Sequence, residues 1–190
     1  MTNPKQVNPQ TVQAALSQLV VIDMQIKLAT AMPVGAMQAV THHCAILVQA
    51  AQLLAVPTII TEQYPQGLGV TLPEITRHLT THKTITKTAF SAMDEPAFCQ
   101  KLHRDQPQMI VTGMETHICV LQTALNLSLF GKQVFVVEDA IISRSASNKA
   151  NAIARLRDAG CTITNTESVL FEWLGNANHA AFKAISALIK

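Results

Sequence analysis

The sequence has few charged residues and no long hydrophobic run. Charged residues make up 14% of the 190 residues, and the formal net charge is +2. Because no run of lysine or arginine stands out, we expect neither a nucleic-acid partner nor binding to an anionic membrane. The apolar runs are only as long as strands, so we expect no transmembrane helix. The N-terminal segment is polar and rich in glutamine, unlike a signal peptide.

Closely spaced cysteines are also missing. The chain has four cysteines, far apart and without a CxxC pair: Cys44, Cys99, Cys119 and Cys161. This spacing favours neither a zinc site nor a disulfide framework. We therefore expect reduced thiols in a cytoplasmic protein.

The glycine-rich motifs that hold nucleotides are absent. Neither GxGxxG nor GxxxxGK[ST] occurs, so we expect no cofactor. His42 and His43 are neighbours in a predicted helix, where adjacent side chains point in different directions. We therefore expect no metal site at this pair.

Hydrophobic residues make up 48% of the chain and follow an alternating pattern of strands and helices. This order predicts an α/β fold, a three-layer α-β-α sandwich with a mainly parallel central sheet. We expect one domain over residues 1–190, with residues 1–12 flexible. The low charge fraction leaves spare apolar surface, which points to a homo-oligomer. The predicted strands cover residues 17–24, 56–62, 82–90, 108–111, 133–138 and 161–164, and the longer helices 36–56, 119–127, 148–159, 168–173 and 180–189.

Cys119 lies between the predicted strand 108–111 and the predicted helix 119–127. Unpaired N–H groups and a partial positive charge at a helix N-terminus favour a thiolate over a thiol. A thiolate is a strong nucleophile, and nearby N–H groups can receive an oxyanion. An inert cysteine in the core fits the local pattern equally well.

Several polar residues follow predicted parallel strands at the edge where open α/β sheets place their sites. Asp23 ends the first strand, and Glu62 and Tyr64 follow the second. From its spacing alone, Asp23 fits slightly better as the cap of a following turn or helix. Glu62 and Tyr64 fit equally well as ordinary loop residues. Lys87 ends the third strand, where a lysine is normally a solvated surface charge.

Four segments of the chain carry recognisable motifs: residues 20–25 (VVIDMQ), 85–91 (ITKTAFS), 111–124 around Cys119, and 136–140 (VVEDA). Together they resemble the isochorismatase-like cysteine hydrolase family. Each segment alone is weak, whereas four in the family's order cover most of the chain. Residues 61–69 with Pro73 and Glu74 are also similar to the isochorismatase domain-containing subgroup.

The resemblance implies a catalytic triad of Asp23, Lys87 and Cys119. It also implies an oxyanion hole formed by the backbone N–H groups of Glu115 and Cys119, and a cis peptide bond between Met114 and Glu115. The implied reaction is hydrolysis of a small amide-like carbonyl substrate through a thioester at the cysteine. No metal is implied, because the segment after the second strand lacks the histidines with which nicotinamidases of the family bind one.

The substrate itself cannot be derived from the sequence. Gln25, Glu62, Tyr64 and Phe90 are the candidates for the substrate pocket. Cys119 favours acyl chemistry over the vinyl-ether cleavage of true isochorismatases, which generally lack this cysteine. A non-catalytic oligomeric module of the same fold and a redox-sensing thiol protein remain the alternatives.

Overall fold

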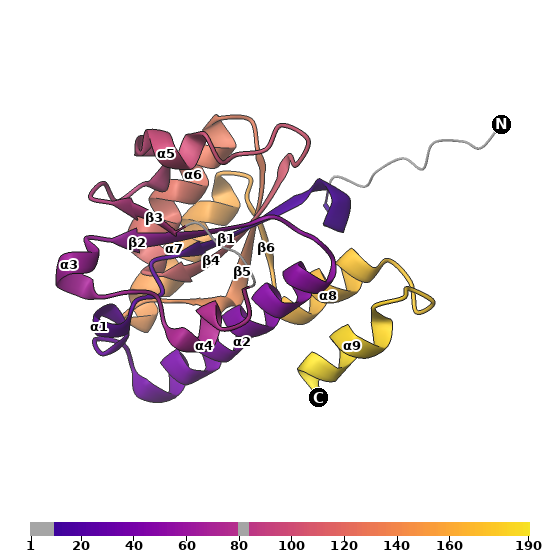
Figure 1. The fold of residues 1–190 in the computed structure, drawn as a ribbon. Coiled ribbons are helices and arrows are strands. Elements are labelled where there is room, and N and C mark those ends of the chain that lie inside the picture. The colour runs from indigo at the N-terminus through magenta and orange to yellow at the C-terminus, as the bar shows by residue number, and fades with distance from the viewer. Residues whose placement is uncertain (1–9, 80–83) are drawn as a thin grey trace.

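The computed structural model describes residues 10–79 and 84–190, and within them six parallel strands form one central sheet (Figure 1). The order across the sheet is β3-β2-β1-β4-β5-β6. The bounds are β1 Ser17–Ile22, β2 Thr58–Gln63, β3 Thr84–Lys87, β4 Gln108–Met114, β5 Gln133–Ile142 and β6 Thr162–Thr164. The predicted α/β class and parallel sheet are therefore confirmed.

Strand β1 lies in the middle of the sheet, and all six of its residues are buried. Its side chains alternate between the two faces, as a pleated strand requires. Leu19 and Val21 join one hydrophobic core, whereas Val20 and Ile22 join the other. The last residue of β1, Ile22, pairs with Thr61 of β2 and Gly113 of β4, so the carboxyl ends of these strands lie side by side.

Helices cover both faces of the sheet and complete the predicted three layers (Figure 1). One core contains residues of α2 and α8, with α9 packed beside them. The other contains residues of α5, α6 and α7. The bounds are α2 Val34–Leu53, α5 Pro96–Cys99, α6 Leu121–Leu129, α7 Ala146–Asp158, α8 Thr166–Leu174 and α9 Phe182–Ser186.

Short elements fill the connections and account for the differences from the predicted pattern. The connection after β2 contains the helical turn α3, and the helix predicted at 119–127 is preceded by a π-helical turn, η3. The short elements are η1 Ala14–Leu16, α1 Ile26–Ala29, α3 Pro65–Leu68, α4 Pro73–Thr76, η2 Ala92–Asp94, η3 Thr116–Val120 and η4 Ala187–Ile189.

The predicted flexibility of residues 1–12 concerns mostly residues 1–9, which lie outside the described residues. Val12 is buried, and its backbone N–H donates to a carboxylate oxygen of Glu172 at 2.7 Å. In the described ranges, no helix combines the length and the hydropathy needed to cross a bilayer.

Candidate active site

Asp23 leaves the carboxyl end of β1 in a left-handed backbone conformation, with a φ of 51°. Its backbone N–H donates to the carbonyl of Thr61 at 3.1 Å, and its Oδ1 accepts from the Thr61 hydroxyl at 2.7 Å. The side chain is fully buried. The backbone and side chain of β2 therefore fix this carboxylate at the sheet edge.

Gly113 allows β4 to approach β1 at the same place. Its φ is +117°, and a Cβ atom at this position would lie 2.0 Å from the carbonyl oxygen of Ile22. No L-amino acid with a side chain fits such a gap without moving the backbone. A glycine here therefore lets the strand that leads to Cys119 run directly beside the strand that carries Asp23.

Lys87 is the last residue of β3, and its side chain extends to Asp23. Its Nζ lies 2.7 Å from Asp23 Oδ2, and neither side chain is exposed. The ammonium also donates to Gln63 Oε1 at 2.6 Å and to the carbonyls of Ala89 and Phe90 at 3.2 Å. The lysine is therefore a buried, partnered cation rather than the solvated surface charge typical of this residue type.

Cys119 lies in η3, close enough to Asp23 and Lys87 for both side chains to act on its thiol. The residue is 6% exposed. Burial raises the pKa of the Cys119 thiol to about 12, the Asp23 charge adds to this increase, and the Lys87 charge opposes it. Our expectation that a helix start would favour a thiolate is therefore wrong for the free protein, because desolvation exceeds the effect of the helix.

The peptide bond between Met114 and Glu115 is cis, the geometry that the resemblance implies. Glu115 then precedes η3, and its carbonyl accepts hydrogen bonds from the N–H groups of Ile118 at 3.0 Å and Val120 at 3.2 Å. Its buried carboxylate accepts from the backbone N–H of Arg144 at 3.0 Å and from its Nε at 3.1 Å. The turn before Cys119 is thus tied to the segment that follows β5.

Two of the four candidates for the substrate pocket, Gln25 and Glu62, use their side chains in hydrogen bonds to neighbouring backbone groups. The amide of buried Gln25 donates to the carbonyls of Gln63 and Gly69 and accepts from the backbone N–H of Gln63. One carboxylate oxygen of Glu62 accepts from both the N–H and the hydroxyl of Thr71. These hydrogen bonds hold the end of β2 and the loop that follows it.

The other two candidates are exposed at the sheet edge. Tyr64 and Phe90 are each 55% exposed. The backbone N–H of Tyr64 donates to the carbonyl of Lys87 at 2.9 Å, and the Phe90 carbonyl accepts from the Lys87 ammonium. Both aromatic side chains are therefore carried by backbone that contacts the buried lysine, where a substrate can reach them.

Sequence reasoning missed three residues that hold the site together, Thr61, Gln63 and Arg144. Thr61 and Gln63 contact Asp23 and Lys87, respectively, and Arg144 contacts Glu115. Their positions contained a usable signal, because each lies at or just after the carboxyl end of a strand. Polar residues at that edge of a parallel sheet are candidates for a site.

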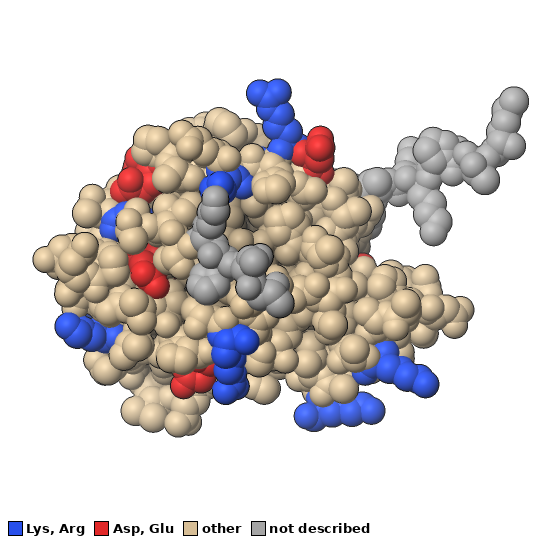
Figure 2. All heavy atoms as spheres, in the orientation of Figure 1, with Lys and Arg blue, Asp and Glu red and all other residues tan. Residues whose placement is uncertain are grey.

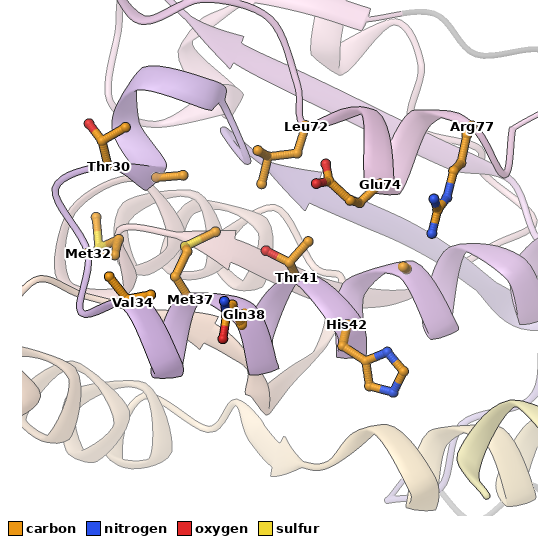
Figure 3. Close-up of a pocket in the computed structure, with 12 residues that line it drawn as sticks. Thr30, Met32, Val34, Met37, Gln38, Thr41, His42, Leu72, Glu74 and Arg77 are labelled. Carbon is orange, nitrogen blue, oxygen red and sulfur yellow. The ribbon is translucent and has the colours of Figure 1, made fainter.

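A separate groove of about 470 Å³ lies between α2 and α4 (Figure 3). Its wall is largely apolar, with Met32, Met37 and Leu72, and it is also lined by Glu74 of α4 and by Arg77, which follows α4. Asp23, Lys87 and Cys119 are not among the residues that line it. The groove is therefore distinct from the site around Cys119.

In residues 10–79 and 84–190, no three His, Cys, Asp or Glu side chains are grouped so that they could hold a metal ion. His43 lies 3.6 Å from Asp139, which also accepts hydrogen bonds from Thr166. This pair links α2, β5 and α8 on the side of the sheet that faces away from the triad.

Comparison with known proteins identifies the family of this chain. The model of the isochorismatase domain matches residues 17–168, a range that contains Asp23, Lys87 and Cys119. The chain belongs to the isochorismatase family. Isochorismatase domain-containing protein 2 of Bos taurus is 43% identical over 147 residues, which are 76% of this chain and 70% of the relative. The secreted isochorismatase effector Isc1 of Phytophthora sojae is 40% identical over 157 residues, 80% of this chain and 74% of the effector.

Two solved structures have the same fold as this chain. The MAR1 ribonuclease from Caenorhabditis elegans has a TM-score of 0.89 and 34% identity, over 94% of this chain and 92% of that one. The YcaC gene product of Escherichia coli, described as an octameric hydrolase of unknown specificity, has a TM-score of 0.87 over 99% of this chain and 91% of that one. At 21% identity, this second likeness concerns the fold alone. Membership of the family suggests a hydrolase, but the names of these relatives do not agree on a substrate.

Proposed function

We propose that this isochorismatase-family chain is a cysteine hydrolase that cleaves a small amide or a related carbonyl compound. One observation carries the proposal: Lys87 Nζ and Asp23 Oδ2 lie 2.7 Å apart with both side chains buried, and the Cys119 thiol is within reach of both. A nucleophile, a base and a cation in one desolvated site are the groups that acyl transfer through a cysteine requires.

The raised pKa of Cys119 gives Asp23 its task. At neutral pH the sulfur carries its proton, so attack on the substrate carbonyl must be accompanied by transfer of that proton to the carboxylate. Asp23 Oδ1 accepts from the Thr61 hydroxyl, whereas Oδ2 faces the Lys87 ammonium at 2.7 Å. Oδ2 is therefore the oxygen suited to take the proton.

The complete cycle balances in protons and bonds. The sulfur–carbon bond forms as the thiol proton moves to Asp23, and the carbonyl oxygen becomes an oxyanion. The oxyanion collapses, the carbon–nitrogen bond breaks, and Asp23 returns the proton to the leaving nitrogen. Water then attacks the thioester, giving a proton to Asp23, and the thiol is restored as the acid leaves. Lys87 stabilises the carboxylate and the developing thiolate throughout.

For the oxyanion we propose the backbone N–H groups of Glu115 and Cys119. The N–H groups in the first turn of a helix lack an acceptor one turn earlier, and Cys119 lies in the single turn of η3. Glu115 is also held by Arg144, so its backbone is in a fixed position before substrate arrives. Donors that are positioned in advance stabilise a developing charge without reorganisation.

The ribonuclease names of three structural neighbours supply a second candidate function. An RNA substrate would need cationic groups along its phosphates. On the face drawn in Figure 2, lysines and arginines are scattered singly among neutral residues and acids. We therefore favour the small-molecule substrate and include RNA among the compounds to be tested.

Three further proposals concern context. We expect one hydrolase domain, a homo-oligomer and a location in the cytoplasm. The octameric state of the YcaC relative and the exposed apolar residues Leu129 and Phe130 support an assembly. The free thiols of the four cysteines fit a reducing compartment, although the Phytophthora sojae relative is named as a secreted protein.

The test is a panel of small amides, esters and single-stranded RNA incubated with wild type, Cys119→Ala and Cys99→Ala. Cys99 is a partly exposed cysteine on α5 and provides the matched control. We expect turnover of an amide or ester in wild type and Cys99→Ala and its loss in Cys119→Ala. Turnover that survives Cys119→Ala unchanged would remove the mechanism. RNA cleavage that depends on Cys119, without amide or ester turnover, would replace the substrate class.

A further inference from the structure

The segment that follows β5 holds a second group of polar side chains beside the nucleophile turn. We propose that Arg144 and Ser143 form a recognition site for a carboxylate on the substrate. This inference rests on the proposed cysteine hydrolase activity and makes it more specific: the preferred amide carries a singly charged acid group. The residues are not part of the proton-transfer machinery described above.

Arg144 is an exposed guanidinium held by a buried acid. Its side chain is 58% exposed, whereas that of Glu115 is 5% exposed. Both oxygens of Glu115 contact Arg144 Nε, at 3.0 and 3.1 Å. The two terminal nitrogens of the guanidinium have no hydrogen-bond partner among residues 10–79 and 84–190. A planar guanidinium fixed at Nε presents these nitrogens as a fork that matches the two oxygens of a carboxylate.

Ser143 adds a hydroxyl donor to this fork. The Nδ2 amide of Asn148 lies 3.3 Å from His117 Nε2, and His117 Nδ1 lies 3.0 Å from Ser143 Oγ. An amide NH₂ can only donate, so Nε2 accepts, and a neutral imidazole must then carry its proton on Nδ1 and donate it to Ser143. The Ser143 hydroxyl proton is left to be donated elsewhere. Ser143 therefore offers a hydroxyl donor, and the adjacent Arg144 offers the two terminal nitrogens of its guanidinium.

Both donors are joined to the turn that carries Cys119. His117 and Cys119 belong to the same five-residue turn, η3, and Glu115 immediately precedes it. Ser143 contacts His117, and Arg144 contacts Glu115. The pairing of Met114 with Ile142 brings the ends of β4 and β5 together, so residues 143 and 144 follow directly beside the nucleophile turn. A substrate bound at Cys119 can thus extend its far end toward them.

The charges favour a monoanion over a phosphate dianion. Asp23 and Lys87 balance each other, as do Glu115 and Arg144, so the site has no large positive excess. Binding here must depend on directed hydrogen bonds from Arg144 and Ser143 rather than on a strong positive field. A carboxylate has one charge and two oxygens in the plane of the fork, which fits this arrangement.

The test compares two thiol-alkylating probes of equal length, N-iodoacetylglycine and its uncharged amide, N-iodoacetylglycinamide. The measured quantity is the ratio of their alkylation rates at Cys119, read by mass spectrometry of the peptide. Dividing by the neutral rate removes any effect of a substitution on the thiol itself. We expect Arg144→Gln to lower the ratio about tenfold, the loss of one charge-assisted hydrogen-bonded contact. Arg157→Gln, which removes the same charge near the other end of α7, should leave the ratio as in wild type.

Arg144→Lys serves if Arg144→Gln does not fold, since it keeps the charge and loses the planar fork; we expect a decrease in the ratio here too. A ratio equal to that of wild type in the folded Arg144 variant would overturn the inference while leaving the triad intact. If neither probe alkylates Cys119 in wild type, the proposed function fails first. An equal decrease in Arg157→Gln would show only a general effect of net charge and would also overturn the inference.

Discussion

Lys87 Nζ lies 2.7 Å from Asp23 Oδ2, and neither side chain has any exposed surface. Removing two charges from water is costly, and a pair of this kind persists only when other groups satisfy its hydrogen bonds. Thr61 provides for the carboxylate, and Gln63 with two backbone carbonyls provides for the ammonium. Substitutions in this ion pair should therefore affect both the stability of the chain and the reactivity of the site.

Breaking one side of this pair should destabilise the chain more than removing both. We expect Lys87→Met to lower the free energy of unfolding by about 3 kcal/mol, because it leaves a buried carboxylate without its cation. The double variant Asp23→Asn/Lys87→Met should regain part of this loss, since neither charge remains. Urea unfolding of the wild type, both single variants and the double variant measures the coupling. Losses that simply add would show that the two groups do not interact.

The reactivity of Cys119 toward iodoacetamide should increase with pH across the whole neutral and mildly alkaline range. Since the pKa of its thiol is raised to about 12, the thiolate fraction increases about tenfold with each pH unit below that value. Asp23→Asn should lower this pKa, because the Asp23 charge is one of the causes that raise it. The rate of labelling of the Cys119 peptide as a function of pH measures both effects. A plateau near neutral pH in wild type would contradict the raised pKa.

The same shift links stability to alkaline pH. Burial raises the pKa of both Cys44 and Cys119 from 9.0 to about 12, so the folded chain retains protons that the unfolded chain releases. The stability from these thiols is fully present below about pH 9 and is lost as the pH rises toward about 12. Each thiol should contribute a loss of about 1.4 kcal/mol per pH unit in this window. Unfolding curves of wild type and Cys44→Ala should therefore differ in slope above about pH 9, and parallel slopes would count against the shift.

Gly113 should not tolerate a side chain. Its φ of +117° and the 2.0 Å approach of a Cβ atom to the Ile22 carbonyl both oppose alanine. We expect Gly113→Ala to lower the free energy of unfolding by about 4 kcal/mol or more. Gly35→Ala is the control, because nothing lies within 4 Å of a Cβ atom at that position in α2. This control should be neutral or slightly stabilising, and equal losses in both variants would contradict the steric argument.

Gln25 should prove to be a framework residue. Gln25→Leu removes the partners of the Gln63 carbonyl and N–H at the end of β2 and of the Gly69 carbonyl in the loop after it. We expect a loss of about 2 to 3 kcal/mol in urea unfolding. Gln38→Leu, at an exposed position on α2, should change stability by less than about 0.5 kcal/mol. A stable Gln25→Leu protein with weakened substrate binding would instead support direct contact with the substrate.

The parallel sheet could be predicted because its strands are buried on both faces. The run Leu19–Ile22 is apolar throughout, and such runs alternate with helical patterns along the chain. Short elements such as α1 and α3, with four residues each, are too short for a hydrophobic period to appear. Their positions depend on tertiary contacts, such as the Gln25 bonds to the loop after β2, that the sequence does not display.

The site was predictable only in part. The residues Asp23, Lys87 and Cys119 could be chosen from motifs in a known order, and the structure brings the three together. The protonation state of Cys119 could not be predicted, because an argument from the helix start alone omits the desolvation that three separate segments produce together. The roles of Gln25 and Glu62 could not be predicted either, since their hydrogen-bond partners lie 9 to 44 residues away in the sequence.

The most direct test of the central claim is to trap the acyl intermediate. Wild type, Cys99→Ala, Cys119→Ala and Asp23→Asn would be mixed with p-nitrophenyl acetate, and acetylated peptides located by mass spectrometry after rapid acid quenching. We expect a burst of p-nitrophenol with acetyl on the Cys119 peptide in wild type and Cys99→Ala, a much smaller burst in Asp23→Asn, and none in Cys119→Ala. A burst of equal size in Cys119→Ala, or acetyl located on another cysteine, would contradict the claim that this buried thiol is the nucleophile.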